Sequence, residues 1–101
     1  MRTLCFLIMA MSVATVLGAA EKYTIAVVPM GTTHQYWKLI HAGAKKAQAE
    51  LQAQGLDVEL IWKGPLREND RDQQVQVVEN FMSRRVSGIV LAPLDMRALV
   101  A

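Results

Sequence analysis

Apolar and polar positions divide the chain into three short hydrophobic runs that alternate with two longer segments of helical spacing. We predict strands over residues 23–28, 57–62 and 88–92. The first run ends in four apolar residues, which is typical of a parallel strand that is covered on both faces. The second run has Val58, Leu60 and Trp62 on one face and Ile61 on the other, so both of its faces also carry apolar side chains.

Two helices are predicted between these runs, because apolar residues recur there every three or four positions. The stripe of the first helix, which begins at Tyr36, is Trp37, Ile40, Ala44, Ala47 and Leu51. Gly55 is expected to end this helix, since glycine adopts the left-handed conformation without steric cost. The second helix has Asp70 or Asp72 as its N-cap. Its stripe is Val75, Val78, Phe81 and Met82.

The order strand, helix, strand, helix, strand predicts a single α/β domain with a parallel sheet and right-handed crossovers. A polar loop follows each strand, over residues 31–35, 63–72 and 93–95. Asp95 in the last loop can cap a final helical turn over residues 96–100. In open α/β sheets, ligands bind in the crevice beyond the carboxyl ends of the strands. We therefore expect function in these three loops.

The first 20 residues have the pattern of a secretory signal peptide. Arg2 provides a positive charge, residues 4–17 form an apolar run, and Gly18-Ala19-Ala20 supplies small residues for cleavage. We predict cleavage after Ala20 and export to the periplasm or cell envelope. The alternative is an uncleaved anchor, but an apolar run of about 14 residues is short for a spanning helix, which needs about 20. The mature chain is not expected to span a membrane.

Charge and cysteine content exclude several classes of protein. The sequence has 11 Lys+Arg and 9 Asp+Glu, and loss of Arg2 with the signal peptide leaves 10 against 9, a net charge of +1. Near-neutral charge argues against a nucleic-acid partner. The one cysteine, Cys5, is lost with the signal peptide, so no disulfide or cysteine metal site is expected in the mature chain.

Catalytic and cofactor motifs are poorly represented. His34 and His41 are the only histidines, and no carboxylate stands near them at a metal-ligand spacing. The loop at Gly31 lacks the second glycine and the lysine of a phosphate loop. No serine lies in a nucleophile-elbow motif. We expect a protein that is not an enzyme and that has no metal or cofactor.

The remaining polar and aromatic residues favour recognition of a sugar. Tyr36 and Trp37 offer flat apolar faces with polar edges. The Asp95 carboxylate can accept hydrogen bonds from two hydroxyl groups, and such charge-assisted bonds are strong. Two alternatives stay open. Trp37 could pack in the core, leaving Tyr36 as the ligand face, and Asp95 could act only as a helix cap.

These features, taken in order over residues 22–101, resemble the periplasmic sugar-binding proteins of ABC transporters, of the ribose-binding type. The segment His34-Gln35-Tyr36-Trp37 stands where the family has an Asn-Pro-Phe-Phe-like segment. Asp70 and Gln74 match an Asp-x-x-x-Gln helix. Ala92-Pro93-Leu94-Asp95 matches an Asn-Pro-x-Asp turn whose carboxylate binds sugar hydroxyls in the family. The segment Trp62-Lys63-Gly64-Pro65 resembles the corresponding segment in the branch of the family that binds rhamnose and autoinducer-2.

The resemblance implies a parallel-sheet, three-layer α/β lobe of the periplasmic binding protein-like I class. It implies a solute-binding component of a transporter, with a small sugar-like ligand and an ABC permease as partners. Tyr36 and Trp37 would stack on the sugar ring, Asp95 would hold its hydroxyls, and His34 would make a polar contact. Lys63 and Arg67 are candidates by position only.

Three substitutions depart from the family pattern. Gln35 replaces the usual proline, and Ser87 replaces a common aspartate. Arg85 stands where a glycine usually ends the second helix. A non-glycine residue costs on the order of 1 kcal/mol if the left-handed turn is kept.

Family members have two similar lobes with the ligand between them, whereas this chain would be truncated after the third strand of the first lobe. We therefore expect residues 21–101 to be the N-terminal part of a sugar-binding domain, and to bind sugar weakly or not at all on their own. The alternatives are a non-functional remnant, a sensor-type binding protein, or the effector domain of a lactose-repressor-like regulator. A signal peptide argues against the regulator, because a DNA-binding headpiece would stand in its place.

Overall fold

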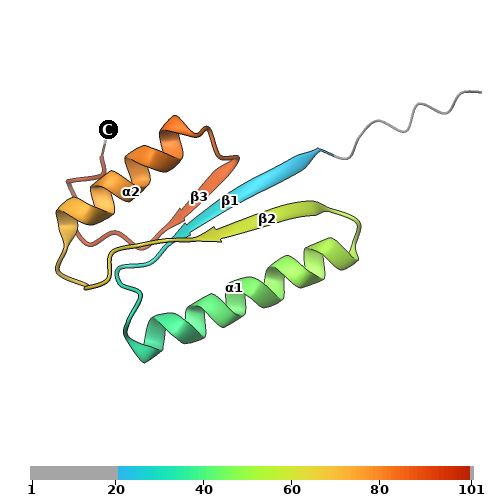
Figure 1. Ribbon diagram of the computed structural model, residues 1–101, viewed down its shortest axis with the longest axis horizontal. Helices are drawn as coiled ribbons and strands as arrows, with labels where there is room; N and C mark the ends of the chain where they lie inside the picture. The colour runs from blue at the N-terminus through green and yellow to red at the C-terminus, as the bar shows by residue number, and fades with distance from the viewer. Residues whose placement is uncertain (1–20, 101) are drawn as a thin grey trace, which may run out of the picture.

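The computed structural model describes residues 21–100, so the predicted signal peptide lies outside the described residues. The elements are β1 (Lys22–Val28), α1 (Gln35–Ala53), β2 (Asp57–Trp62), α2 (Arg71–Ser83) and β3 (Gly88–Leu91), as Figure 1 shows. The predicted order is confirmed, and each boundary agrees with the prediction to within a residue or two. After β3, residues 96–99 form a turn and not an α-helix.

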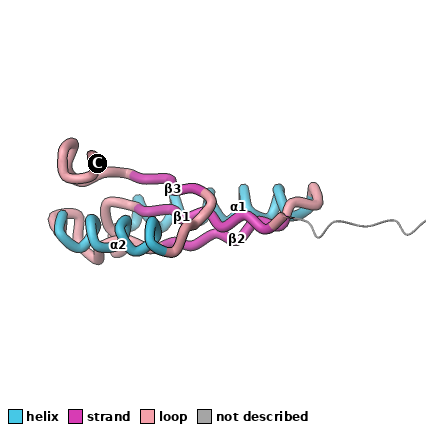
Figure 2. The backbone as a smooth tube through the Cα atoms, turned by 90° about the horizontal axis from the view of Figure 1, so that it is seen from above, coloured by secondary structure: helices cyan, strands magenta, loops and turns pink. Residues whose placement is uncertain are grey.

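The three strands form a parallel sheet in the order β2-β1-β3, which confirms the predicted α/β class. Ile25 pairs with Leu60 on one side of β1, and Ala26 pairs with Ile89 on the other. Figure 1 shows α1 and α2 on opposite sides of the sheet, and Figure 2 shows helices and strands running along one common direction. Within residues 21–100, neither helix combines the length and apolarity that a membrane span requires.

The core lies between the sheet and α2. Its buried residues are Ala26, Val28, Val77, Val78 and Phe81, and partly buried Ile61, Val86, Ile89, Leu91 and Leu99 pack against them. The buried face of α2 is Gln74, Val77, Val78 and Phe81, which follows helical spacing. The prediction of Met82 in the stripe is wrong, because Met82 is one position past this face and 60% exposed.

The other helix, α1, packs on the sheet through a stripe that includes polar residues. Trp37, His41, Ala44, Gln48 and Leu51 are the buried or partly buried positions. Ile40 and Ala47, which were predicted in the stripe, are exposed. The reason is that His41 stacks on Trp62 of β2, and the Gln48 amide donates to the backbone oxygen of Val58. These contacts let polar side chains occupy the positions that periodicity assigned to apolar neighbours.

Two left-handed residues end the helices. Gly55 has φ 88° after α1, as expected, and Arg85 has φ 53° after α2. Arg85 therefore adopts the left-handed conformation at the position where the family pattern has a glycine. At the start of α2, Asp70 is the N-cap, since its carboxylate accepts the backbone N–H of Gln73 at 3.1 Å.

Replacing Arg85 by glycine tests the left-handed turn. The substitution removes a steric cost of about 1–2 kcal/mol and adds unfolded-state freedom worth roughly 0.5–1 kcal/mol. We expect the free energy of unfolding, measured in urea, to rise by about 0.5–1 kcal/mol. Arg84→Gly is the matched control, because Arg84 has φ −76° and lies 5.6 Å from the Phe81 ring. The control should lose stability, and a loss in both variants would contradict the expectation.

The stack of His41 on Trp62 predicts a pH-dependent stability. The centroids of the two rings lie 4.4 Å apart, and the angle between the ring planes is 7°. Burial lowers the pKa of His41 from its ordinary 6.5, and the charge of Lys45 lowers it further. The folded state therefore prefers neutral His41. The contribution of this preference to the free energy of unfolding is complete above pH 6.5 and is lost as pH falls through the lowered pKa.

Urea denaturation of the unchanged protein should therefore give a lower free energy of unfolding at pH 5 than at pH 7.5. His41→Phe keeps an aromatic ring on Trp62 but cannot titrate, so its stability should change less over the same interval. An equal change in both proteins would assign the pH dependence to other groups.

Candidate functional site

The loops that follow the three strands gather at one end of the sheet, as Figure 1 shows. They cover residues 29–34, 63–70 and 92–100. This is the edge at which ligands bind in open α/β folds. The predicted polar loops are thus placed side by side.

The first two loops are joined by close backbone contacts. The Thr33 hydroxyl donates to the backbone oxygen of Leu66 at 2.9 Å. A Cβ added to Gly64 would lie 2.9 Å from the backbone oxygen of Pro29, and one added to Gly31 would lie 2.9 Å from Cγ of Glu68. Real Cβ atoms do not approach this closely. Glycine at 31 and 64 therefore allows the two loops to touch.

Of the aromatic pair at the start of α1, Trp37 is buried and Tyr36 is not. Trp37 is 8% exposed, whereas Tyr36 is 55% exposed. The indole N–H of Trp37 donates to the Glu68 carboxylate at 2.5 Å. The Tyr36 ring meets the Trp37 ring edge-on, with centroids 5.0 Å apart. This geometry favours the alternative in which Trp37 packs inside and Tyr36 presents the free aromatic face.

His34 is the N-cap of α1. Its Nδ1 accepts the backbone N–H of Tyr36 at 3.1 Å, and its side chain is exposed. A neutral imidazole that accepts at Nδ1 carries its proton on Nε2. His34 in this tautomer therefore has an N–H donor at Nε2 on an exposed side chain.

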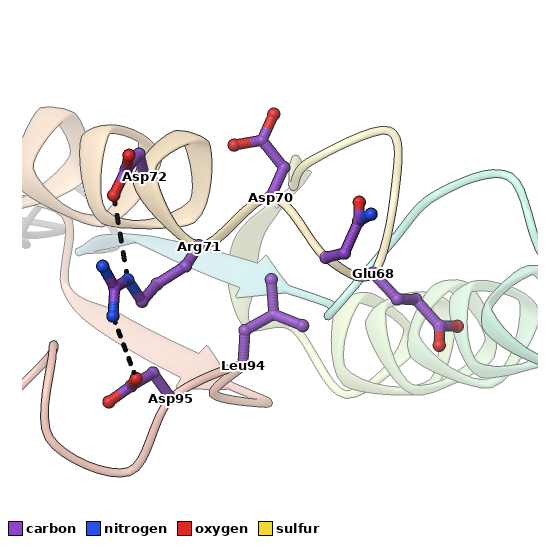
Figure 3. A pocket seen from close by; sticks show the side chains of 7 residues that line it. Glu68, Asp70, Arg71, Asp72, Leu94 and Asp95 are labelled. Atoms are coloured by element: carbon purple, nitrogen blue, oxygen red, sulfur yellow. Dashed lines mark hydrogen bonds and ion pairs between the residues drawn. The ribbon is translucent and has the colours of Figure 1, made fainter.

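Asp95 lines an open cavity of about 410 Å³. The cavity is lined by Glu68, Asn69, Asp70, Arg71, Asp72, Leu94 and Asp95. In Figure 3, Arg71 reaches from the start of α2 toward Asp95, with its guanidinium 3.3 Å from the carboxylate. Arg71 also lies 3.8 Å from Asp72. One cation is therefore shared by two carboxylates.

Hydrogen bonds favour the ionised form of the Asp95 carboxylate. One oxygen accepts the backbone N–H groups of Arg97 and Ala98 at 2.8 and 2.9 Å. These two bonds, and then the hydrogen bond from Arg71, lower the pKa of Asp95 from its ordinary 3.8. Asp95 thus caps the final turn through one oxygen, as predicted, and its other oxygen pairs with the Arg71 guanidinium in the cavity lining.

The structure brings only part of the predicted set together. Asp95 lines the cavity, and Trp37 reaches it through Glu68. Tyr36 and His34 stand at the same edge but outside the cavity lining. Lys63 lines a second, smaller hollow of about 230 Å³ beside α2. The ligand roles of Tyr36, Trp37, Asp95 and His34 stay predictions.

The sequence did not point to Arg71 or Glu68, and it did not show that Gln74 binds the backbone of two loops. Gln74 is 1% exposed, and its amide binds both the first and the third loop. The Asp-x-x-x-Gln spacing was the available signal, since it places the cap at Asp70 and the amide one turn later. Within residues 21–100, no group of three His, Cys, Asp or Glu side chains is arranged to hold a metal ion.

Comparison with known proteins gives a consistent result. The periplasmic binding protein domain family matches residues 25–101. The D-ribose/D-allose-binding protein of Pseudomonas aeruginosa is 32% identical over 80 residues, which are 79% of this chain and 24% of that protein.

Two solved structures share the fold. A carbohydrate transporter solute binding protein from Agrobacterium radiobacter, in complex with D-arabinose, has a TM-score of 0.62 and 31% identity. The match covers 73% of this chain and 23% of that one. A glucose-galactose binding protein from Geobacillus stearothermophilus has a TM-score of 0.58 and 33% identity, over 68% of this chain and 22% of its own.

The chain spans about a quarter of the length of these proteins. Their names describe sugar or solute binding, and the name of the Agrobacterium protein also describes carbohydrate transport. The resemblance inferred from the sequence is confirmed by the family match over residues 25–101. This chain belongs to the periplasmic binding protein family and corresponds to an N-terminal portion of its sugar-binding members.

Proposed function

We propose that this chain forms part of the solute-binding component of an ABC transporter and contributes to a cleft for a sugar or sugar-like molecule. The names of all three similar proteins refer to sugars or carbohydrates. Residues 21–101 would be the N-terminal part of the binding domain, exported after cleavage of residues 1–20. The binding protein would deliver its ligand to a membrane permease.

One observation carries this proposal: an exposed aromatic ring and a carboxylate whose pKa is lowered by hydrogen bonds stand at the same edge of the sheet. Tyr36 offers its ring face, and Asp95 offers the carboxylate oxygen that it shares with Arg71 in the cavity lining. A sugar has flat C–H faces and hydroxyl groups at its rim, so it needs both kinds of contact. The Nε2–H of His34 supplies a donor for a ring or hydroxyl oxygen.

The roles within the aromatic pair follow from burial. The residues of this chain alone already cover Trp37 to 8% exposure, so little of its ring is free for a ligand. Trp37 instead supports Tyr36 by edge contact and holds the second loop through Glu68. The proposal therefore gives the stacking role to Tyr36 and a supporting role to Trp37.

Tyr36→Ala should weaken sugar binding. Loss of the stacking face costs about 1.4 kcal/mol, which is roughly a tenfold rise in Kd. The measurement is calorimetric titration of the native protein, purified from a periplasmic extract, with D-ribose, D-allose, D-arabinose, D-glucose and D-galactose. Tyr23→Ala is the control, because Tyr23 is also exposed but lies at the opposite end of β1. An equal effect of both substitutions would contradict the role of Tyr36.

The charge of the cavity predicts which sugars are rejected. Four carboxylates (Glu68, Asp70, Asp72 and Asp95) line it against the single guanidinium of Arg71. Juxtaposed like charges disfavour association. We expect a neutral hexose to bind more tightly than the matching uronate, by roughly tenfold or more at low salt. Titration of the native protein with D-galactose and D-galacturonate tests this, and tighter binding of the uronate would contradict it.

A further inference from the structure

The most completely satisfied polar side chain in the core is Gln74. It is 1% exposed and belongs to the largest fully buried side chains. Its amide nitrogen donates to the backbone oxygens of Pro29 at 3.1 Å and Ala92 at 2.9 Å. Its amide oxygen accepts the backbone N–H of Leu94 at 2.8 Å. Both donors and the acceptor of one amide are therefore used by loop backbone.

These bonds stand at the point where two parallel strands separate. The ladder between β1 and β3 ends with the bond from the Ala92 N–H to the Val28 oxygen at 3.0 Å. Pro29 follows Val28 and has no N–H to continue the ladder. Beyond this point the Gln74 amide replaces the missing backbone hydrogen bond, since it donates to the next carbonyl after each strand, those of Pro29 and Ala92.

The same amide links the two halves of the proposed sugar site. Pro29 begins the loop that leads to His34 and Tyr36, and Leu94 precedes Asp95. The amide is carried by α2, whose Val77, Val78 and Phe81 are packed against the sheet. The helix is thus a rigid support from which one side chain holds both loops.

We propose that Gln74 is a positioning residue, which fixes the distance between the Tyr36 side and the Asp95 side of the sugar site without touching the ligand. This inference rests on the proposed function. Sites bind most tightly when their contact groups are held in place before the ligand arrives. Without the amide, both loops lose a shared anchor, and the buried carbonyls of Pro29 and Ala92 lose a donor.

The test is the Kd of the unchanged protein and of its Gln74→Met and Val77→Ala variants for D-ribose, D-allose, D-arabinose, D-glucose and D-galactose, at a temperature where all three proteins are folded. Gln74→Met keeps the length of the side chain but removes all three bonds. We expect Kd to rise roughly tenfold or more. Val77→Ala is the matched control, since Val77 is buried on the same helix face but lies in the core cluster and makes none of these loop bonds. Its Kd should stay within about twofold.

A second readout separates positioning from general stability. Hydrogen exchange of the Leu94 N–H should be faster in Gln74→Met than in Val77→Ala, because only the first loses its acceptor. If Gln74→Met does not fold, Gln74→Glu keeps the shape and an acceptor for Leu94, and carries the same expectation for Kd. Equal affinities of the Gln74 variant and the control would overturn this role alone. Absence of sugar binding by the unchanged protein would overturn the proposed function, and this role with it.

Discussion

The arrangement of the first and third loops depends on one buried amide at the place where β1 and β3 diverge. A parallel sheet satisfies its backbone only while its strands run together, and Pro29 ends that pairing on β1. Gln74 takes over by binding Pro29, Ala92 and Leu94. Because α2 is anchored by Phe81 in the core, the amide transfers the rigidity of the core to two loops.

The second loop is attached by a different device, which is close approach of backbone. Gly31 and Gly64 leave room where any side chain would collide, and Thr33 closes the contact with a hydrogen bond. The Trp37 indole then joins the start of α1 to Glu68. Three loops of different sequence thus form one continuous polar edge, on which Tyr36 is exposed and Asp95 is partly buried. In open α/β sheets, ligands bind beyond the carboxyl ends of the strands, which is where this edge lies.

The order of strands and helices along the chain and the caps at Asp70 and Gly55 followed from the sequence, because they depend on local periodicity and backbone chemistry. The errors came from tertiary contacts. Stacking of His41 on Trp62 turned α1 so that Ile40 is exposed, and no periodicity rule weighs a polar residue that finds a partner. The sequence placed Tyr36 and Asp95 in loops at this edge, and their ligand roles stay predictions. The pairing of Arg71 with Asp95 could not be predicted, because it depends on loops that meet in space.

The most direct measurement is a ¹H–¹⁵N NMR titration of the native protein with D-ribose and the other candidate sugars. If the loops at the carboxyl ends of the strands form the sugar site, the chemical-shift changes within this part of the chain will concentrate in residues 29–37, 66–72 and 92–98. The Gln74 side-chain amide will move with them, since it bonds two of these loops. Shifts centred instead on the hollow formed by Lys63, Gln76 and Asn80, with the three loops unchanged, would contradict this account of the protein.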